Sequence, residues 1–506
     1  MLARILNLPF LVILMGIGAA AMYVPAIYAY VGDDMRVARV FLYGGTLFLI
    51  LTAMVGLASA AGTSTNLVRS HLLALLGAFT VLPLMLAVPF HEAVRDTSFL
   101  NAYFEMVSSL TTTGATLFVP DRLPDALHLW RAMVGWMGGF LVWVTAIAVL
   151  APLNLGGFEV TSIDATSNSN GQFSQITNVA NASQRLARYA ALLFPIYAGL
   201  TLILWIALLL AGDASLVAVS HAMSTLSTSG ISPVRGLGEG TGSGGFGEVI
   251  IFCFLFYAIS RRTFSHDKQQ RGLRRLREDP EFRIGAFLVI VLPLFLFARH
   301  WVAAYDIDLE NDLAAALRAL WGAAFTVLSF LTTTGFESTD WIDARGWSGL
   351  QSPGLILMGL SIIGGGVATT AGGVKLMRVY ALYKHGTREM ERLLHPSSVG
   401  GAGTHARYIR RSGAQISWIF FMLFSMSVAA VMLALSLTGL SFENATVFTI
   451  SALSTTGPLV GVAAQDTLTY ADLGSVAKMI LAATMVLGRL ETLAIIALLN
   501  PALWRS

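Results

Sequence analysis

Four heptapeptides in this chain combine small hydroxyl residues with a closing glycine, a combination that suits the binding of a dehydrated cation. They are SSLTTTG at 108–114, STLSTSG at 224–230, SFLTTTG at 329–335 and SALSTTG at 451–457. A cation that sheds its water needs several oxygen ligands, and a ring of backbone carbonyls supplies them. Glycine permits the positive φ that turns successive carbonyls toward one axis. The four copies therefore predict four quarters of one ion site.

The residues that we expect to contact the ion are the last three of each copy. They are Thr112, Thr113 and Gly114; Thr228, Ser229 and Gly230; Thr333, Thr334 and Gly335; and Thr455, Thr456 and Gly457. A simpler interpretation is that each heptapeptide only ends a helix, since glycine commonly takes the left-handed position just past a helix C-terminus. That interpretation suits a single copy, whereas four copies at equivalent places favour the ion site.

The composition places these motifs in a membrane protein. Of the 506 residues, 55% are hydrophobic and 12% are charged, whereas a soluble domain carries roughly a quarter charged residues. The net charge of +3 does not indicate a nucleic-acid partner, because basic residues in a membrane protein mark its cytoplasmic loops. Cys253 is the lone cysteine, which excludes an intramolecular disulfide and a zinc cluster.

A spanning helix needs about 20 mostly apolar residues, and runs of that kind recur along the chain. The candidate spans are 9–31, 37–60, 71–90, 130–152, 187–211, 248–260, 284–302, 352–381, 414–438 and 473–499. The first is too long for a signal peptide and has no small-residue cleavage pattern. All ten are therefore predicted to be helices of an all-α integral membrane protein.

Charge predicts which segments face the cytoplasm. Segments 261–283 and 375–411 each hold eight Lys or Arg, so both are predicted to be cytoplasmic. The segment between them, 303–350, is rich in Asp and Glu and should lie outside. It contains the apolar stretch 313–331, which we interpret as a re-entrant pore helix. Re-entrant backbone is tolerated only where protein buries it or where it lines a water-filled path, so a pore is expected.

Two features predict a gate beneath the filter. The first is IIGGGVATTAGGVK at 362–375, whose gate residues are Gly364, Gly365, Gly366, Thr369, Thr370, Gly372 and Gly373. Five glycines would cost a regular helix roughly 4 to 5 kcal/mol relative to alanine, so we expect a broken helix with a movable loop; close packing of small residues between helices is the alternative. The second is Arg489 near the centre of the last apolar run, where a charge is costly. Glu491 lies on another helix face and should pair with a different unit.

A glycine-rich stretch follows the second filter, and three acidic residues follow the third. GSGGFG at 242–247 formally matches a dinucleotide fingerprint but lacks the βαβ context, so we expect an extracellular linker. Glu337, Asp340 and Asp343 follow the third filter and either concentrate cations at the entrance or form an ordinary solvated loop.

With these motifs the chain resembles the Trk/Ktr/HKT potassium transporters, and among them the TrkH/TrkG membrane subunits of bacterial Trk systems. The resemblance covers nearly the whole chain and implies four units of helix M1, pore loop and helix M2 around a pseudo-fourfold pore. The units are expected at 70–152, 187–262, 284–385 with a broken M2, and 412–500, after a two-helix extension at 1–62. In that family four filter glycines favour potassium, an intramembrane loop lies beneath the filter, and the matching arginine raises the barrier to cations.

The resemblance also implies a cellular role. It predicts a non-enzymatic, multi-pass protein of the bacterial inner membrane that takes up potassium, with potassium as substrate at the filter and no cofactor in this chain. It further implies a homodimer and a cytosolic regulatory ring of the nucleotide-binding TrkA type on the basic inner loops. The alternatives are a symporter that couples potassium to sodium or protons, which would need a coupling ion, and a membrane enzyme or scaffold, for which no catalytic constellation is evident.

Overall fold

The structure is a computed structural model. It describes residues 8–59, 67–151, 157–160, 182–234, 236–238, 241–260, 279–303, 313–348, 354–395, 411–463 and 468–490. All regular secondary structure in these segments is helical, as the composition and the apolar runs predict.

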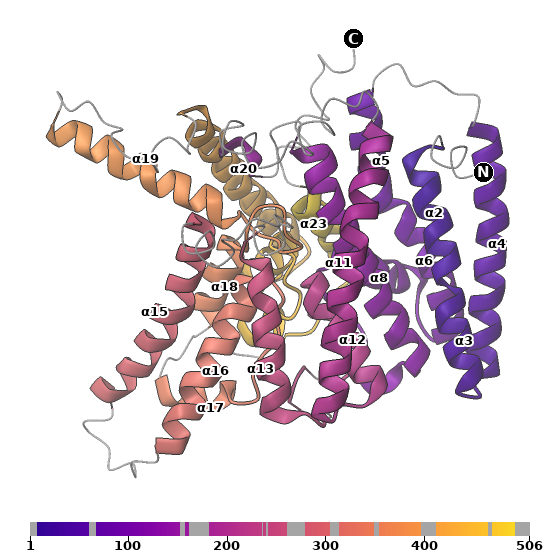
Figure 1. Ribbon diagram of the computed structural model, residues 1–506, viewed down its shortest axis with the longest axis horizontal. Coiled ribbons are helices and arrows are strands. Elements are labelled where there is room, and N and C mark those ends of the chain that lie inside the picture. The colour runs from indigo at the N-terminus through magenta and orange to yellow at the C-terminus, as the bar shows by residue number, and fades with distance from the viewer. Residues whose placement is uncertain are drawn as a thin grey trace.

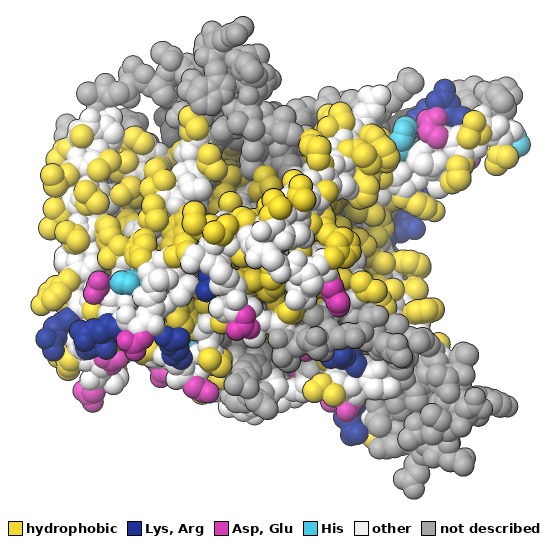
Figure 2. Space-filling model, turned by 180° about the vertical axis from the view of Figure 1, so that it is seen from behind, with side chains coloured by type: hydrophobic (Ala, Val, Ile, Leu, Met, Phe, Trp, Pro, Cys, Tyr) yellow, Lys and Arg dark blue, Asp and Glu magenta, His cyan; other side chains and the backbone are white. Residues whose placement is uncertain are grey.

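Seven helical stretches among the described residues are long and apolar enough to cross a membrane. They are Phe10–Val31, Met35–Ser59, Leu73–Val94, Asp125–Leu150, Arg185–Ala211, Pro280–Ala298 and Gly413–Ser436. Three shorter apolar helices are Gly244–Ala258, Ala316–Leu331 and Gly354–Ile363. Figure 2 shows apolar side chains across the middle of one face, with charged side chains along the lower edge of that face and on one projecting helix. This belt is the surface that a lipid bilayer covers.

An N-terminal group of helices stands at one side of the molecule. It consists of α2 (Phe10–Ala21), α3 (Tyr23–Val31) and α4 (Met35–Ser59). The helices α2 and α3 together make one span, and α4 packs on α2, α3 and α6 (Leu82–Val94). In Figure 1 this group lies farthest from α19, beside the bundle that holds the four heptapeptides.

Four times along the chain a long helix is followed by a pore helix that ends at a heptapeptide. The long helices are α5 (Leu67–Thr80) with α6, α11 (Ala182–Ala211), α15 (Pro280–Ala303) and α20 (Arg411–Ser436). The pore helices are α7 (Phe99–Leu110), α12 (Ser215–Ser227), α16 (Leu313–Leu331) and α21 (Phe442–Leu453). The helix predicted at 313–331 is confirmed by α16, which spans the same residues; its re-entrant path through a membrane stays a prediction.

A second apolar helix follows each heptapeptide. These helices are α8 (Asp125–Thr145) with the π-turn η2 (Ala146–Leu150), α13 (Gly244–Leu255) with η4 (Phe256–Ala258), α18 (Gly354–Ile363) and α23 (Ser475–Leu490). Four short elements lie between the longer helices: η1 (Pro120–Arg122), η3 (Phe158–Val160), α17 (Trp341–Ser348) and α22 (Leu459–Ala463). The linker expected at 242–247 is wrong in part, because its last four residues form the first turn of α13.

Serine side chains define where two of the pore helices begin. The hydroxyl of Ser98 accepts a hydrogen bond from the backbone N–H of Asn101 at 3.3 Å, and Ser441 accepts from the N–H of Asn444 at 3.3 Å. Each serine satisfies one of the free N–H groups that a helix N-terminus leaves. These caps fix the start of α7 and α21, and so the level at which each helix delivers its heptapeptide.

The third unit has a divided second helix. It consists of α18 and α19 (Leu376–Leu394), separated by residues 364–375, and α19 projects from the bundle in Figure 1. The first two basic residues of segment 375–411 are buried in the protein, since Lys375 and Arg378 are 7% and 0% exposed. The amine of Lys375 donates to the carbonyl of Ala371, and the guanidinium of Arg378 lies 3.7 Å from the centre of the Phe420 ring. Both cations are therefore part of the interior beside the divided helix.

Candidate ion-binding ring and gate

Each heptapeptide ends its pore helix in the same way. The backbone N–H at the sixth position donates to the carbonyl at the first position, at 2.8 Å for Thr113, 3.0 Å for Ser229, 2.9 Å for Thr334 and 2.9 Å for Thr456. The fifth residue is left-handed, with φ of +54° at Thr112, +51° at Thr228, +56° at Thr333 and +55° at Thr455. This is a helix C-cap of the Schellman kind. The simpler interpretation is thus right about the cap, but threonine rather than glycine takes the left-handed position.

A left-handed threonine is uncommon because its branched side chain crowds the backbone. The strain is on the order of 1 kcal/mol or more per residue, and here it recurs at four equivalent positions. Such strain persists where the surroundings enforce it, typically at functional sites. The conformation turns the chain sharply, so that the following carbonyls leave the helix axis and approach the neighbouring units.

A hydroxyl pair fastens each filter strand to its helix. The side-chain oxygens at the fourth and sixth positions are 2.8 Å apart in the first copy, 3.0 Å in the second, 3.1 Å in the third and 3.2 Å in the fourth. The fourth-position hydroxyl also donates to the carbonyl one helical turn earlier in every copy. The hydroxyls of Thr113, Ser229, Thr334 and Thr456 therefore hold the strand in place.

The filter glycines join the four units into a closed ring. A Cβ added to Gly114 would overlap the carbonyl oxygen of Ser229, and one on Gly230 would overlap that of Thr334. A Cβ on Gly335 would lie 3.1 Å from Pro458 in the fourth unit. The N–H of Gly457 donates to the carbonyl of Thr113, at 2.5 Å, and so returns to the first unit. Each unit thus meets the next in chain order, and the fourth meets the first.

The ring departs from fourfold symmetry at its last member. Gly114, Gly230 and Gly335 have φ of +74°, +64° and +82°, whereas Gly457 is not left-handed. Its N–H makes the hydrogen bond to the first unit instead. The carbonyl oxygens of Thr113, Ser229 and Thr334 lie against glycines of neighbouring units, and the C-terminal ends of the pore helices carry the negative ends of the helix dipoles. The arrangement concentrates partial negative charge where the four filters meet.

The glycine-rich segment 364–375 packs directly against these filters. The Thr370 hydroxyl lies 3.2 Å from that of Thr228 and 2.6 Å from that of Tyr257, and it donates to the carbonyl of Leu226 at 3.1 Å. The N–H of Gly372 donates to the hydroxyl of Thr333 at 2.7 Å. A side chain at Gly372 would overlap the carbonyl of Ser454 in the fourth unit. The segment therefore packs against the second, third and fourth heptapeptides.

Arg489 contacts the first filter from the same side. It is 7% exposed, and its guanidinium donates to the hydroxyl of Thr112. It lines a cavity of about 30 Å³ together with the π-turn at the end of α8 and residues between 368 and 375. This is about the space of one water molecule. Glu491, the neighbour that sequence reasoning paired with another unit, lies outside the described residues.

Glu281, near the start of α15, was not predicted from the sequence. It holds residues 364–375, here called the gate segment, against α15. The carboxylate of Glu281, 1% exposed, accepts a hydrogen bond from the N–H of Val367 at 2.8 Å. The adjacent N–H of Gly366 donates to the carbonyl of Ala258, at the end of η4, at 2.9 Å. An acidic residue at the start of a long apolar helix was the available signal, because it has no obvious role in a membrane.

Replacing Glu281 with alanine is expected to increase ion flux through the purified protein. A buried N–H that loses a charged acceptor costs about 1–3 kcal/mol, which shifts the equilibrium between the observed and the displaced position of the gate segment by roughly fivefold to 150-fold. Glu281→Gln keeps an oxygen acceptor and serves as the matched control. Equal flux through Glu281→Ala, Glu281→Gln and the unchanged protein in liposomes would contradict the role assigned to Glu281.

The acidic residues beyond the third filter differ in their surroundings. The carboxylate of Asp343 lies 3.9 Å from the guanidinium of Arg318, with both side chains more than half exposed. Burial raises the pKa of the Glu337 carboxyl, while Arg345 lowers it, so Glu337 loses its charge at a higher pH than an ordinary glutamate. Among the residues that the structure describes, no group of three His, Cys, Asp or Glu side chains is placed to hold a metal ion.

Comparison with known proteins gives consistent results. A family model described as TrkH, cation transport protein, matches residues 244–505. The Trk system potassium uptake protein TrkH of Salmonella typhimurium is 32% identical over 432 residues, covering 85% of this chain and 84% of that protein. TrkG of Escherichia coli, also named a Trk system potassium uptake protein, is 28% identical over 428 residues, or 82% of this chain and 81% of TrkG. The crystal structure of the potassium transporter TrkH from Vibrio parahaemolyticus superposes with a TM-score of 0.80 at 27% identity, covering 100% of both chains.

Proposed function

The chain belongs to the TrkH family of cation transport proteins, and we propose that it carries potassium into the cell across the bacterial inner membrane. The observation that carries this proposal is the closed ring of four filters, each delivered by its own pore helix. The relatives named as potassium uptake proteins share more than four fifths of its length. We propose a transporter rather than an enzyme, because the family model is described as a cation transport protein.

The ion contacts that we propose are the carbonyls around the four filter glycines together with the hydroxyls of Thr112, Thr228, Thr333 and Thr455. The glycines bring carbonyls of adjacent units to the same level, and the hydroxyl pairs behind them hold each strand. Arg489, Thr370 and Gly372 contact the hydroxyls of Thr112, Thr228 and Thr333, and we propose that these contacts lie on the inner side of the ring. A potassium ion leaving the ring inward would take the place of these contacts.

Residues 364–375 and Arg489 are proposed to form the gate of this pathway. The segment blocks the inner side of the ring, and the arginine adds a positive charge at the cavity beneath it. Five glycines give the segment the backbone freedom to move aside. Opening would break the hydrogen bonds from Thr370 and Gly372 to the second and third filters.

The organisation of the chain and its partners follow from the same proposal. We place the four units at 70–152, 187–262, 284–385 and 412–500, after the extension at 1–62. We further propose a homodimer whose basic inner loops dock a cytosolic nucleotide-binding ring of the TrkA type, because the relatives are named as parts of a Trk system. A nucleotide effect on transport would then require that partner.

Growth of a bacterium that lacks its own potassium uptake tests the proposal. The unchanged chain should restore growth at low potassium, and Gly335→Ser should not, because a Cβ on Gly335 meets Pro458 and its φ is +82°. Gly199→Ser is the control, since a Cβ on Gly199 has no atom within 4 Å. Full growth with Gly335→Ser at equal protein levels would count against the proposed function.

A further inference from the structure

The strand that leaves each of the first three filters is fastened by one side chain of the pore helix. That side chain stands three residues before the heptapeptide: Glu105, His221 and Thr326. Glu105 accepts from the N–H of Leu117 at 3.1 Å, and the ring nitrogen Nε2 of His221 lies 2.9 Å from the hydroxyl of Ser232. Thr326 accepts from the N–H of Ser338 at 3.4 Å. The partner lies two or three residues beyond the filter glycine each time.

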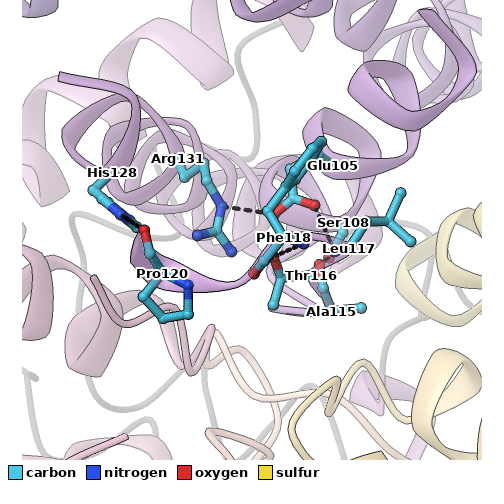
Figure 3. A network of polar contacts seen from close by, with 9 residues as sticks. All are labelled: Glu105, Ser108, Ala115, Thr116, Leu117, Phe118, Pro120, His128 and Arg131. Carbon is cyan, nitrogen blue, oxygen red and sulfur yellow. Dashed lines mark hydrogen bonds and ion pairs between the residues drawn. The ribbon is translucent and has the colours of Figure 1, made fainter. Parts of the chain in front are cut away.

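The brace of the first filter is the most strongly held. Glu105 is 0% exposed, and its second carboxylate oxygen lies 2.6 Å from Nε of Arg131 on α8. Figure 3 shows this pair joining α7 to α8 beside residues 115–118, where Ser108 donates to the carbonyl of Ala115 at 2.7 Å. Two charges removed from water are costly unless they are well paired. A buried pair at this place therefore indicates that the position of the segment after the first filter must be fixed more tightly than an apolar contact would fix it.

The third filter has an additional brace, and the fourth has a different one. In the third, Glu248 of α13 also accepts from the N–H of Thr339 at 2.6 Å and from the hydroxyl of Ser338 at 2.7 Å. In the fourth, Phe448 stands at the brace position, and the hydroxyl of Tyr470 instead donates to the carbonyl of Gly457 at 3.1 Å. This filter is also the one whose glycine is not left-handed. The fourth filter thus differs from the other three both in its brace and in the conformation of its glycine.

We propose that Glu105, locked by Arg131, is a positioning residue for cation selectivity at the first filter. It fixes the outer strand through Leu117, only three residues from Gly114, and so limits how far the carbonyls of this quarter can approach a smaller ion. Without the brace the strand relaxes, and the ring contracts enough to accept sodium. The inference rests on the proposed potassium transport and adds a selectivity role to residues outside the filter.

The test uses a double variant that keeps the fold. Replacing a buried ion pair with apolar residues of similar size is often neutral or stabilising, so Glu105→Leu combined with Arg131→Met should fold and insert like the unchanged chain. It nevertheless lacks the acceptor for the N–H of Leu117. The measured quantity is the ratio of rubidium to sodium uptake into liposomes, with rubidium as the potassium probe, alongside thermal stability.

We expect the ratio to fall by roughly tenfold, the factor that corresponds to one lost buried hydrogen bond, with rubidium uptake retained. Thr326→Val is the control, because Glu248 still holds the third strand, and its ratio should change by less than about twofold. A folded double variant with an unchanged ratio would overturn the inference, as would an equal fall in Thr326→Val. Absence of rubidium uptake in the unchanged chain would instead refute the proposed function.

Discussion

Replacing Gly114 with alanine is expected to abolish potassium uptake. Gly114 has φ of +74°, and a Cβ there would overlap the carbonyl oxygen of Ser229 in the next unit. A left-handed alanine costs roughly 1–2 kcal/mol before any overlap is counted. The overlap itself has no cheap relief, because the atom that would have to move is backbone in the ring. The carbonyl of Ser229 must shift, and the oxygen ring loses the geometry that replaces the ion's water.

Uptake of rubidium into liposomes that contain purified Gly114→Ala checks this prediction. Gly199→Ala is the matched control, since the same methyl group on α11 meets no atom within 4 Å. We expect uptake near background for Gly114→Ala and unchanged uptake for Gly199→Ala. If Gly114→Ala transports at the rate of the unchanged chain, the close meeting of the first and second filters does not form the ion site.

Replacing Arg489 with alanine is expected to have the opposite effect and raise cation flux. Arg489 reaches the hydroxyl of Thr112 and lines the cavity beneath the ring. A unit charge about 6 Å from a permeating cation repels it by roughly 3 kcal/mol at an effective dielectric constant near 20. Removing the charge also removes the hydrogen bond that covers the first filter from the inner side. The expected increase is therefore at least about tenfold and at most about a hundredfold.

Arg489→Lys separates the charge from the hydrogen-bonding geometry of the guanidinium. Lysine keeps the positive charge but not the planar fork of donors, so its flux should lie between those of the unchanged chain and Arg489→Ala. Flux from purified protein in liposomes at matched protein content measures the series. Equal flux through all three proteins would exclude Arg489 as the barrier.

Repetition made the central site predictable from the sequence. The four heptapeptides identify the ring because the same seven positions recur, and the structure shows the same cap and hydroxyl pair in each of them. The apolar segment 313–331 indicated a re-entrant helix because it was too apolar for an outer loop, and α16 spans the same residues. These are local patterns, which one chain can display without reference to its fold.

The contacts that hold the site were not predictable, because they join residues far apart in the chain. Glu281 meets Val367 across 86 positions, and Glu248 meets Thr339 across 91 positions. Lys375 was counted with the cytoplasmic basic residues, yet it is buried at the gate segment. The short glycine-rich stretch at 242–247 was interpreted as a linker because its helical first turn depends on packing that the sequence does not display. Composition predicts whether a segment lies in lipid or in water more readily than it predicts which residues the segment contacts.

The most direct test of the account is ion flux through the purified chain in liposomes, with potassium, rubidium and sodium compared and no sodium or proton gradient applied. The account predicts uptake of potassium and rubidium that exceeds sodium uptake, is lost in Gly114→Ala and is raised in Arg489→Ala. Sodium uptake equal to potassium uptake, or potassium uptake that survives in Gly114→Ala, would contradict the claim that the four filters form one potassium-selective ring.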